Sequence, residues 1–276
     1  MTLKAQAILL AAGRGERMRP LTDTLPKPLL QVQGKALMEW PLLALQAGGF
    51  KAAVVNTAWL GEKVESFFLD KNKSIPALHA DSLLLNKSGI LVNFDLIFSR
   101  EGQDFGGALE TAGGIVRALP QLEDVFWVAA GDVFAPGFEF TPSAVDRFAA
   151  SGKLAHLWLV PNPAHNLRGD FGLSPAAENT AGGLNLAPNL ALNLPQDATE
   201  PRYTYSTIGL YRQAFFALPY CSIPPGNPEG IKAPLAPMLR AAMDNRQVSA
   251  QIYTGPWTDV GTPERLAELN RPQKVS

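Results

Sequence analysis

The stretch AQAILLAA, residues 5–12, runs directly into GRGERMRP, residues 13–20. An almost unbroken apolar run that ends at a glycine predicts a strand buried on both faces, as in the centre of a parallel sheet. Gly13 and Gly15 let the main chain of the turn approach a ligand closely, and three arginines in the same turn can meet phosphate charge. The two segments therefore indicate a phosphate site at the first turn of an α/β fold. An ordinary connecting turn is the alternative, because the GxGxxG and Walker spacings are both missing.

Helix and strand patterns alternate through the first half of the chain. Apolar residues recur at helical spacing over 37–47, and Gly48 and Gly49 end that predicted helix. Further strands are expected over 52–55, 90–98 and 125–130, and further helices over 62–69 and 108–119. This alternation predicts a doubly wound, mostly parallel, Rossmann-like sheet. Charged residues and Pro76 interrupt the pattern over 70–89, where we expect an excursion from the core.

The second half of the chain is less regular. We predict helices over 143–149, 234–243 and 263–269 and strands over 154–160, 203–211 and 248–253. Thr262 is placed to cap the last helix. The intervening region, residues 161–202, is rich in Asn, Pro and Gly, which predicts a small irregular β subregion beside the site.

Composition and charge argue against several classes of function. The chain has 276 residues, 46% of them hydrophobic, enough for one large core. Its 24 basic and 25 acidic residues are mixed along the chain, so nothing predicts binding to nucleic acid or to an anionic membrane. A single cysteine, Cys221, excludes an internal disulfide and a cysteine-based zinc cluster. The N-terminal segment lacks a secretion signal and no segment reaches the length of a membrane span, so we expect a cytoplasmic protein.

Two polar residues lie where an α/β sheet binds ligands. Lys27 is flanked by Pro26 and Pro28, which restrict the backbone and fix where the lysine side chain emerges. Asp132 follows the predicted strand 125–130, at the carboxyl end where open sheets bind their ligands. A carboxylate there can hold Mg²⁺ while waters and phosphate oxygens complete the coordination. Capping of a helix is the alternative role for Asp132.

Together, LAAGRGERMRPLT (residues 10–22) and PKPLL (residues 26–30) resemble the sugar-1-phosphate nucleotidyltransferase family. The resemblance implies a GT-A-like sheet and the transfer of a nucleoside monophosphate from a triphosphate to a sugar 1-phosphate, with release of pyrophosphate. It implies that the triphosphate is held by Gly13, Gly15, Glu16, Arg17 and Lys27. Arg17 and Lys27 are accordingly expected to act in catalysis as well.

The resemblance extends to AAGDV (residues 129–133) and WTDVGTPE (residues 257–264), and it implies that Asp132 and Asp259 are the ligands of Mg²⁺. Two carboxylates from distant segments can hold one or two cations against the α-phosphate while an incoming phosphate oxygen displaces pyrophosphate in line. We count both aspartates as catalytic, and no nucleophilic side chain is required. Capping of the last helix is the alternative for Asp259.

A third segment, LETAGGI (residues 109–115), corresponds to an ETGGG-like run in relatives. The resemblance implies that Glu110, Thr111 and Gly113 contact the nucleotide, whereas Ala112 departs from the pattern. Glycines at the start of a helix allow close approach of a base or ribose. The alternative is that the glycine pair serves tight helix packing.

The acceptor is implied by the segments NTAWL (56–60), RGDF (168–171) and YTYSTIG (203–209), which most resemble the uridylyltransferase branch that acts on N-acetylmuramate α-1-phosphate in cell-wall recycling. UTP and this sugar 1-phosphate are therefore the expected partners. Asn162 and Asp170 are the implied sugar contacts. The alternative is that each is simply a polar loop residue exposed to solvent. Ala130 stands where this branch commonly has an amide, a difference that bears on sugar selection.

Other functions fit parts of the pattern. The same chemistry could use mannose 1-phosphate with GTP or glucose 1-phosphate with dTTP. A non-catalytic regulatory module that binds a sugar nucleotide would not need two aspartates and Lys27 together. A dinucleotide-dependent oxidoreductase would need the GxGxxG turn. We expect one domain over 1–276, with a nucleotide-binding half (about 1–134) and a sugar-binding half (about 135–276), as a monomer or homodimer.

Overall fold

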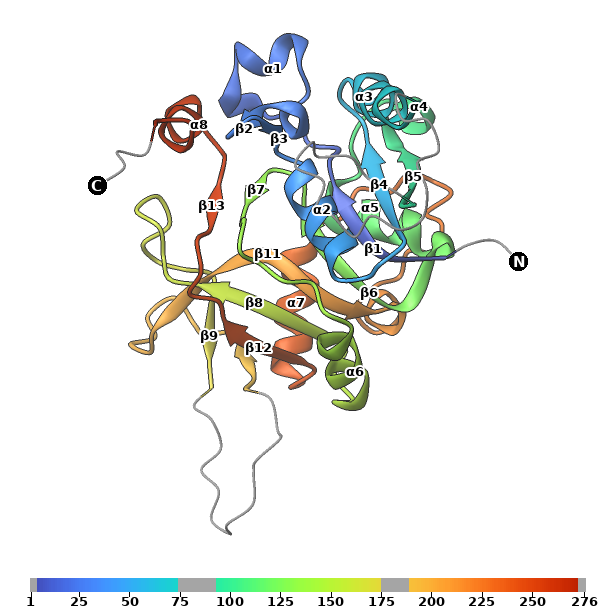
Figure 1. The fold of residues 1–276 in the computed structure, drawn as a ribbon. Helices are drawn as coiled ribbons and strands as arrows, with labels where there is room; N and C mark the ends of the chain where they lie inside the picture. The colour runs from blue at the N-terminus through green and yellow to red at the C-terminus, as the bar shows by residue number, and fades with distance from the viewer. Residues whose placement is uncertain (1–3, 74–92, 175–188, 273–276) are drawn as a thin grey trace.

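The computed structural model describes residues 4–73, 93–174 and 189–272. At its centre, β1 (Ala5–Leu10) runs parallel to β4 (Ala52–Thr57) on one side and to β6 (Leu122–Ala130) on the other. The strand β5 (Asp95–Arg100) continues the parallel sheet beyond β4 (Figure 1). All six residues of β4 are buried, as expected for a strand covered on both faces.

The second half of the chain extends the same sheet. The long strand β11 (Arg202–Arg212) pairs antiparallel with β6 and with β8 (Ala155–Val160), and β12 (Val248–Ile252) runs parallel to β8. Two short strands, β9 (Phe171–Leu173) and β10 (Ala191–Leu192), pair antiparallel beside the start of β11. Within the described part of the chain the sheet has nine strands, in the order β10-β9-β11-β6-β1-β4-β5, with β8 and β12 joined through β11. One sheet therefore joins the two halves of the sequence.

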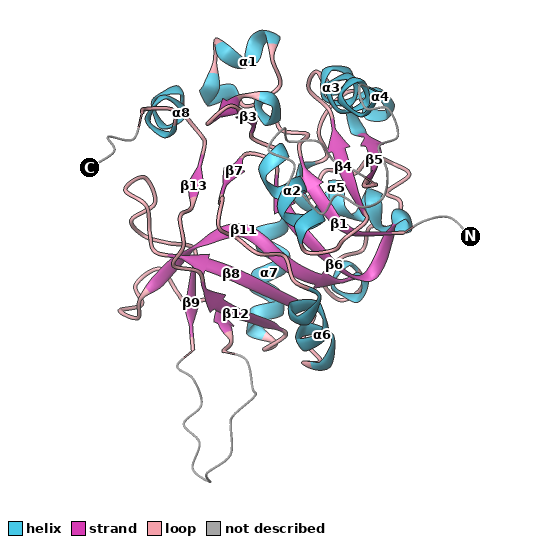
Figure 2. Cartoon of the chain, in the orientation of Figure 1, coloured by secondary structure: helices cyan, strands magenta, loops and turns pink. Residues whose placement is uncertain are grey.

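Helices cover both faces of this sheet (Figure 2). On one face, α5 (Glu110–Ala118) and α7 (Leu235–Asp244) pack against alternate strand residues such as Ile8 and Val128. The other face is covered by α2 (Glu39–Ala47), α3 (Gly61–Lys73) and α6 (Pro142–Ala150), packed on residues of the opposite parity such as Leu9 and Trp127. The predicted α/β fold with a doubly wound, mostly parallel sheet is confirmed, and the antiparallel β11 is added to it.

A smaller layer stands beyond the carboxyl ends of the parallel strands (Figure 1). It contains the N-terminal elements η1 (Glu16–Met18), α1 (Leu21–Thr24), η2 (Lys27–Leu29), β2 (Gln31–Val32) and β3 (Lys35–Ala36). The late elements β13 (Thr258–Asp259) and α8 (Pro263–Leu269) join it, together with β7 (Val133–Phe134). These elements share a separate core around Met18, Phe134 and Val260. The first and last segments of the chain therefore meet over the sheet.

Most element boundaries agree with the sequence prediction to within a few residues. The last helix covers Pro263–Leu269 as predicted, and Thr262 Oγ1 accepts a hydrogen bond from the Arg265 amide at its start. The strand predicted over 90–98 begins later, at Asp95, and residues 90–92 lie outside the described part. The predicted excursion at 70–89 starts within α3, and its residues 74–89 also lie outside the described part. The short elements that were not predicted include α4 (Glu101–Phe105), η3 (Leu119–Gln121) and η4 (Gln213–Phe216), as well as the short helices and strands of the smaller layer other than α8. Among the described helices, none has the length and apolar character needed to cross a membrane.

Candidate functional site

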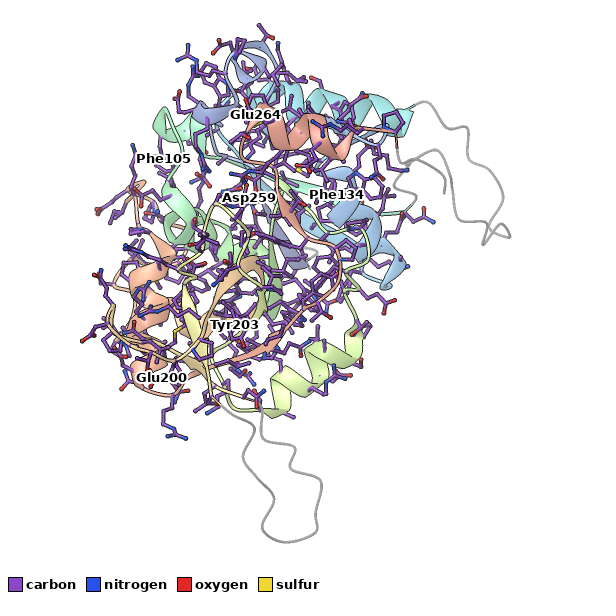
Figure 3. The ribbon with its side chains drawn as sticks, turned by 90° about the vertical axis from the view of Figure 1, so that its left-hand side faces the viewer. Phe105, Phe134, Glu200, Tyr203, Asp259 and Glu264 are labelled. Carbon is purple, nitrogen blue, oxygen red and sulfur yellow. The ribbon has the colours of Figure 1, made fainter. Side chains whose placement is uncertain are left out.

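Asp132 and Asp259 are brought together by a two-stranded ribbon. The strands β7 and β13 pair antiparallel, with Asp259 opposite Val133 and Thr258 opposite Phe134. The Val260 amide donates to the main-chain oxygen of Asp132 at 3.1 Å. Figure 3 shows Asp259 and Phe134 close to each other between the sheet and α8, whose Glu264 is labelled above them. Two acidic residues that are distant in sequence thus line one cavity, in the layer that also contains the first turn.

Lys27 reaches the same place from the N-terminal segment. Its side chain is 9% exposed, and its Nζ lies 2.5 Å from Asp132 Oδ2. The turn before it passes close by: Gly15 has φ of 69°, and a Cβ added there would lie 3.2 Å from Lys27 Cβ. Because a left-handed backbone and a close approach both favour glycine, Gly15 is the residue that lets this turn fold over Lys27. Thr22 Oγ1 donates to the Gly15 carbonyl at 2.9 Å and fixes the turn further.

Asp259 is also paired with basic groups. Arg265 Nη1 lies 2.8 Å from Asp259 Oδ1 and donates to the Asp259 carbonyl, also at 2.8 Å. On the other carboxylate oxygen, His165 Nε2 lies 3.2 Å from Asp259 Oδ2. Arg265 lies in the first turn of α8, and His165 comes from the loop after β8. Two separate segments, α8 and the loop after β8, therefore fix the position of this carboxylate.

Three adjoining cavities meet at Asp132, which lines all of them. The first, of about 280 Å³, is lined by Gly13, Gly15, Glu16, Arg17 and Lys27, among others. The second, of about 420 Å³, also includes Arg17 and Lys27 and adds Asp259, His165 and Asp170. The third, of about 660 Å³, includes Glu110, Thr111 and Asp170. The structure thus brings together on one continuous wall ten of the twelve residues predicted for the site: Gly13, Gly15, Glu16, Arg17, Lys27, Glu110, Thr111, Asp132, Asp170 and Asp259.

A buried carboxylate joins the first turn to the segment before α5. Glu101 is fully buried, and it accepts hydrogen bonds from Asn56 Nδ2 and from the Leu109 amide, both at 2.7 Å. Asn56 Oδ1 accepts in turn from the Ala11 amide at 2.7 Å. Burial raises the pKa of Glu101, and the two donated hydrogen bonds act in the opposite direction. This chain of contacts holds Glu110, which has φ of 60°, at a fixed position relative to the first turn.

The wall around Asp170 is formed by the irregular β subregion. Asp170 Oδ2 accepts from the Tyr205 amide at 2.8 Å, and its Oδ1 accepts from Asn166 Nδ2 at 3.3 Å. The pairing of β11 with β8 shifts register between Tyr205 and Gly209, and Thr207 within that bulge has φ of 60°. Tyr205 and Thr207 line the second and third cavities with Asp170. The bulge therefore directs part of β11 toward the site, a common use of such irregularities.

Gly113 and Asn162, the other two predicted contacts, lie behind the wall. The Gly113 amide donates to the Ala233 carbonyl at 3.1 Å, and a Cβ at Gly113 would lie 2.5 Å from the Ile231 carbonyl oxygen. Asn162 donates to the carbonyls of Leu167 and Arg202 and accepts from Thr204 Oγ1. Neither residue lines the three cavities. Gly113 therefore serves the close packing of α5 against the segment before α7, and Asn162 stabilises its own loop.

Several residues that sequence reasoning missed lie on the cavity walls or hold them. His165, Asn166, Thr207 and Trp257 line the second cavity, and Arg265 pairs with Asp259. Arg265 directly follows the quoted WTDVGTPE motif, so its place one turn into a capped helix was an available signal. The role of Thr207 depends on a bulge in a long strand pattern, which has no local sequence signal.

The carboxylates of Asp132 and Asp259 fit a cation whose remaining ligands are waters and phosphate oxygens. Each aspartate is now neutralised by side chains, Asp132 by Lys27 and Asp259 by Arg265. Within residues 4–73, 93–174 and 189–272, no group of three or more His, Cys, Asp or Glu side chains is arranged to hold a metal ion. Magnesium is commonly bound by one or two carboxylates together with waters and phosphate oxygens, so this oxygen donor pair fits Mg²⁺ with a bound triphosphate.

Comparison with known proteins points in the same direction. A family model described as nucleotidyl transferase matches residues 6–179. The chain is 39% identical over 272 residues to the N-acetylmuramate alpha-1-phosphate uridylyltransferase of Neisseria meningitidis serogroup B, covering 95% of this chain and 96% of that protein. A protein of the same name from Caulobacter vibrioides is 36% identical over 146 residues, 52% of each chain.

Two solved structures resemble the whole fold. A UTP-bound UGPase from Acinetobacter baumannii has a TM-score of 0.65 at 17% identity, with coverage of 98% of this chain and 92% of that chain. The inositol-1-phosphate CTP transferase from T. maritima has a TM-score of 0.62 at 15% identity and 97% coverage of both chains. At such low identity these likenesses show a shared fold.

Proposed function

Because the chain belongs to the nucleotidyl transferase family, we propose that it joins UMP from UTP to N-acetylmuramate α-1-phosphate, giving the UDP-sugar and pyrophosphate. The observation that carries this proposal is the convergence of Asp132 and Asp259 beside Lys27, in a chain 39% identical over nearly its full length to a protein named for this reaction. The reaction belongs to cell-wall recycling, and we place it in the cytoplasm, where UTP is made.

In this proposal the triphosphate occupies the first cavity. Main-chain amides of the turn at Gly13 and Gly15 can approach its phosphates, and Arg17 and Lys27 supply positive charge on the same wall. Arg17 and Lys27 also line the second cavity, where the phosphate of the acceptor would enter. The side chains of Arg17 and Lys27 therefore lie where the reacting phosphates would meet, and they would stabilise the charge that develops during transfer.

Asp132 and Asp259 would hold Mg²⁺, which neutralises phosphate charge and orients the leaving pyrophosphate. For Asp132 to do so, the Lys27 ammonium, now 2.5 Å from its Oδ2, must turn toward a phosphate oxygen. Arg265 and His165 keep Asp259 in a fixed orientation from the side of α8. The chain's own task is thus to align an acceptor phosphate oxygen with the α-phosphate for in-line displacement.

The nucleotide base and the sugar would share the third cavity. Its wall near Glu110 and Thr111 would take uracil and ribose, because the Glu101 network fixes that segment against the first turn. Asp170, held by the Tyr205 amide, would accept hydrogen bonds from sugar hydroxyls. Guanylyl or thymidylyl transfer to mannose 1-phosphate or glucose 1-phosphate is the main alternative, and a regulatory module that binds a sugar nucleotide is the alternative without catalysis.

Pyrophosphate release separates these functions. We expect turnover with UTP, Mg²⁺ and N-acetylmuramate α-1-phosphate that exceeds turnover with GTP, dTTP or CTP and with glucose or mannose 1-phosphate. Preferred use of GTP or dTTP would overturn the uridylyl assignment. Binding of a sugar nucleotide without pyrophosphate release for any pair of substrates would favour the regulatory module.

The matched variants Asp132→Asn and Asp124→Asn test the role of the metal-binding carboxylate. Asp124 lies within β6 and Asp132 follows it. The Asp124 side chain is 71% exposed and lines none of the three cavities. We expect Asp132→Asn to lower kcat on the order of 10³-fold, since charge stabilisation worth several kcal/mol is lost, and to keep its circular dichroism spectrum. Asp124→Asn should retain full turnover. Unchanged turnover of Asp132→Asn at saturating Mg²⁺ would refute the assigned role.

A further inference from the structure

The third cavity has a charge pattern that the transfer reaction alone does not explain. Of the described residues on its wall, Glu110, Asp132 and Asp170 are acidic, and Arg240 of α7 alone carries a positive charge. Arg17 and Lys27, which we assign to the phosphates, lie on the walls of the other two cavities. A third cationic side chain, separate from Arg17 and Lys27, thus lies on the wall of the proposed base and sugar region.

Arg240 is held in place without a described acidic partner. Its Nη1 donates to Asn193 Oδ1 at 2.9 Å, and its guanidinium carbon lies 5.2 Å from the centre of the Phe171 ring. Asn193 Nδ2 donates in turn to Asp244 Oδ1 at 3.0 Å, so an amide stands between the guanidinium and that carboxylate. Within the described ranges, no ion pair joins Arg240 to an acidic side chain. A guanidinium has five N–H donors, so donors remain for a ligand in the cavity.

The position of Arg240 is on the sugar side of this cavity. Phe171, which its guanidinium faces, directly follows Asp170 and begins β9, whereas Glu110 and Thr111 begin α5. Leu235 and Leu239, from the same helix as Arg240, add an apolar surface to the wall. An acceptor with methyl groups and one anionic substituent would match this combination of apolar surface and single cation.

We propose that Arg240 binds the carboxylate of the lactyl ether that N-acetylmuramate carries on O3, and so selects this sugar 1-phosphate over N-acetylglucosamine 1-phosphate. The inference rests on the proposed function, because it concerns the acceptor named there. The two sugars differ only in that ether, so a group that distinguishes them must contact it. Asp132 and Asp170 on the same wall would repel an anionic substituent, and the planar guanidinium both offsets that repulsion and matches a carboxylate in two parallel hydrogen bonds.

The test measures kcat/KM with UTP, Mg²⁺ and three acceptors in the full-length enzyme. The acceptors are N-acetylmuramate α-1-phosphate, its analogue with the lactyl carboxylate converted to the amide, and N-acetylglucosamine 1-phosphate. The variant Arg240→Met keeps the apolar length of the side chain and removes its charge. Arg147→Met is the control, because Arg147 is an exposed arginine of α6 that lines none of the three cavities.

We expect Arg240→Met to lower kcat/KM for N-acetylmuramate α-1-phosphate on the order of 10- to 100-fold, as for loss of one partner of a partly buried charge pair. Values for the amide analogue and for N-acetylglucosamine 1-phosphate should stay near those of the unmodified enzyme, and Arg147→Met should change none of the three. An equal loss for all three acceptors, or no loss for the first, would overturn the inference and leave the proposed function standing. Failure of the unmodified enzyme to use N-acetylmuramate α-1-phosphate at all would overturn the proposed function itself, and the inference with it.

Discussion

At the scale of single residues, Lys27 shows how local sequence fixes a charge in space. Pro26 and Pro28 restrict the backbone on both sides, and the side chain is buried under the turn that contains Gly15. Lys27 lines the cavities, where its ammonium group lies 2.5 Å from Asp132 Oδ2. A cation held in this way can exchange a carboxylate for a phosphate without a change in the backbone.

We therefore expect Lys27→Ala to raise KM for UTP on the order of 10- to 100-fold, because a hydrogen bond to a charged group contributes about 1.5–3 kcal/mol. KM for the sugar 1-phosphate should change much less. Initial rates measured with each substrate varied in turn separate the two effects, and Lys51→Ala, at an exposed lysine before β4, is the control. A larger effect on the sugar phosphate would mean that the triphosphate and acceptor positions are reversed.

His156 on β8 is expected to make stability depend on pH. Burial lowers the pKa of His156 to about 4, and its Nδ1 lies 2.9 Å from Ser249 Oγ. Between pH 6.5 and about 4 the unfolded chain binds a proton at this residue that the folded protein does not bind, so the free energy of unfolding falls as pH falls through that window. We expect His156→Gln to lose this part of the dependence, up to about 3 kcal/mol. Urea unfolding at several pH values between 4 and 7 measures it, and identical pH slopes for both proteins would contradict the assignment.

At the scale of elements, the turn between β13 and α8 controls the geometry around Asp259. A Cβ added at Gly261 would lie 2.7 Å from Asp259 Oδ1, 3.2 Å from Arg265 Nη1 and 3.3 Å from Arg17 Nη2. All three atoms are at the ends of side chains, and Gly261 does not have a positive φ. An alanine here is therefore accommodated by displacement of functional groups, while the backbone stays in place.

Gly261→Ala should consequently lower kcat/KM by roughly 10- to 100-fold, the cost of a small misplacement of catalytic groups. Its Tm should stay within about 2 °C of the unmodified protein, because no backbone strain or core cavity is introduced. Gly137→Ala is a matched control, since a Cβ there would meet only Tyr253 Oη at an ordinary 3.5 Å. A large fall in Tm with unchanged turnover would show that the turn serves folding alone.

The elements that sequence predicted well are those with a strong local pattern. The apolar run before Gly13, the glycine end of α2 and the Thr262 cap of α8 are each set by a few adjacent residues, and the structure has all three. The antiparallel direction of β11 could not be predicted in this way. The pattern of apolar and polar residues in a strand does not encode whether the strand runs parallel or antiparallel to its neighbours. The two-residue strands β7 and β13 are too short to show any period, although they bring Asp132 and Asp259 together.

At the scale of the whole molecule, the candidate site lies where the parallel strands end and the first and last segments of the chain meet. The sequence motifs predicted ten residues of the cavity wall, because each motif follows a strand end or starts a helix. They did not predict Asn166, Thr207 or Arg265 as neighbours of the aspartates, since these contacts depend on how a loop, a bulge and a helix pack together. For the same reason the choice between a nucleotide contact and the packing role of Gly113 could be made only once residues 231–233 were placed against it.

If Mg²⁺ takes part of its ligands from the protein and part from UTP, the two ligands together should raise the thermal stability of the protein more than either does alone. Two carboxylates with no further acidic or histidine cluster among the described residues provide too few ligands to hold Mg²⁺ tightly alone. We therefore expect Mg²⁺ alone to change Tm little, whereas Mg²⁺ with UTP at about 100 times its Kd should add about 2.7 kcal/mol to the free energy of unfolding and raise Tm by roughly 5–10 °C.

Thermal unfolding with Mg²⁺ alone, with UTP alone and with both together measures this dependence. In Asp132→Asn, Mg²⁺ with UTP should give no greater stabilisation than UTP alone. The physical reason is linkage: a cation that shares its ligands between the protein and the triphosphate binds the folded state tightly only when both are present. A shift with Mg²⁺ alone as large as that with Mg²⁺ and UTP would mean that the chain holds the cation without the nucleotide. The convergence of Asp132 and Asp259 would then form a resident metal site, and the assignment of the remaining ligands to the triphosphate would be wrong.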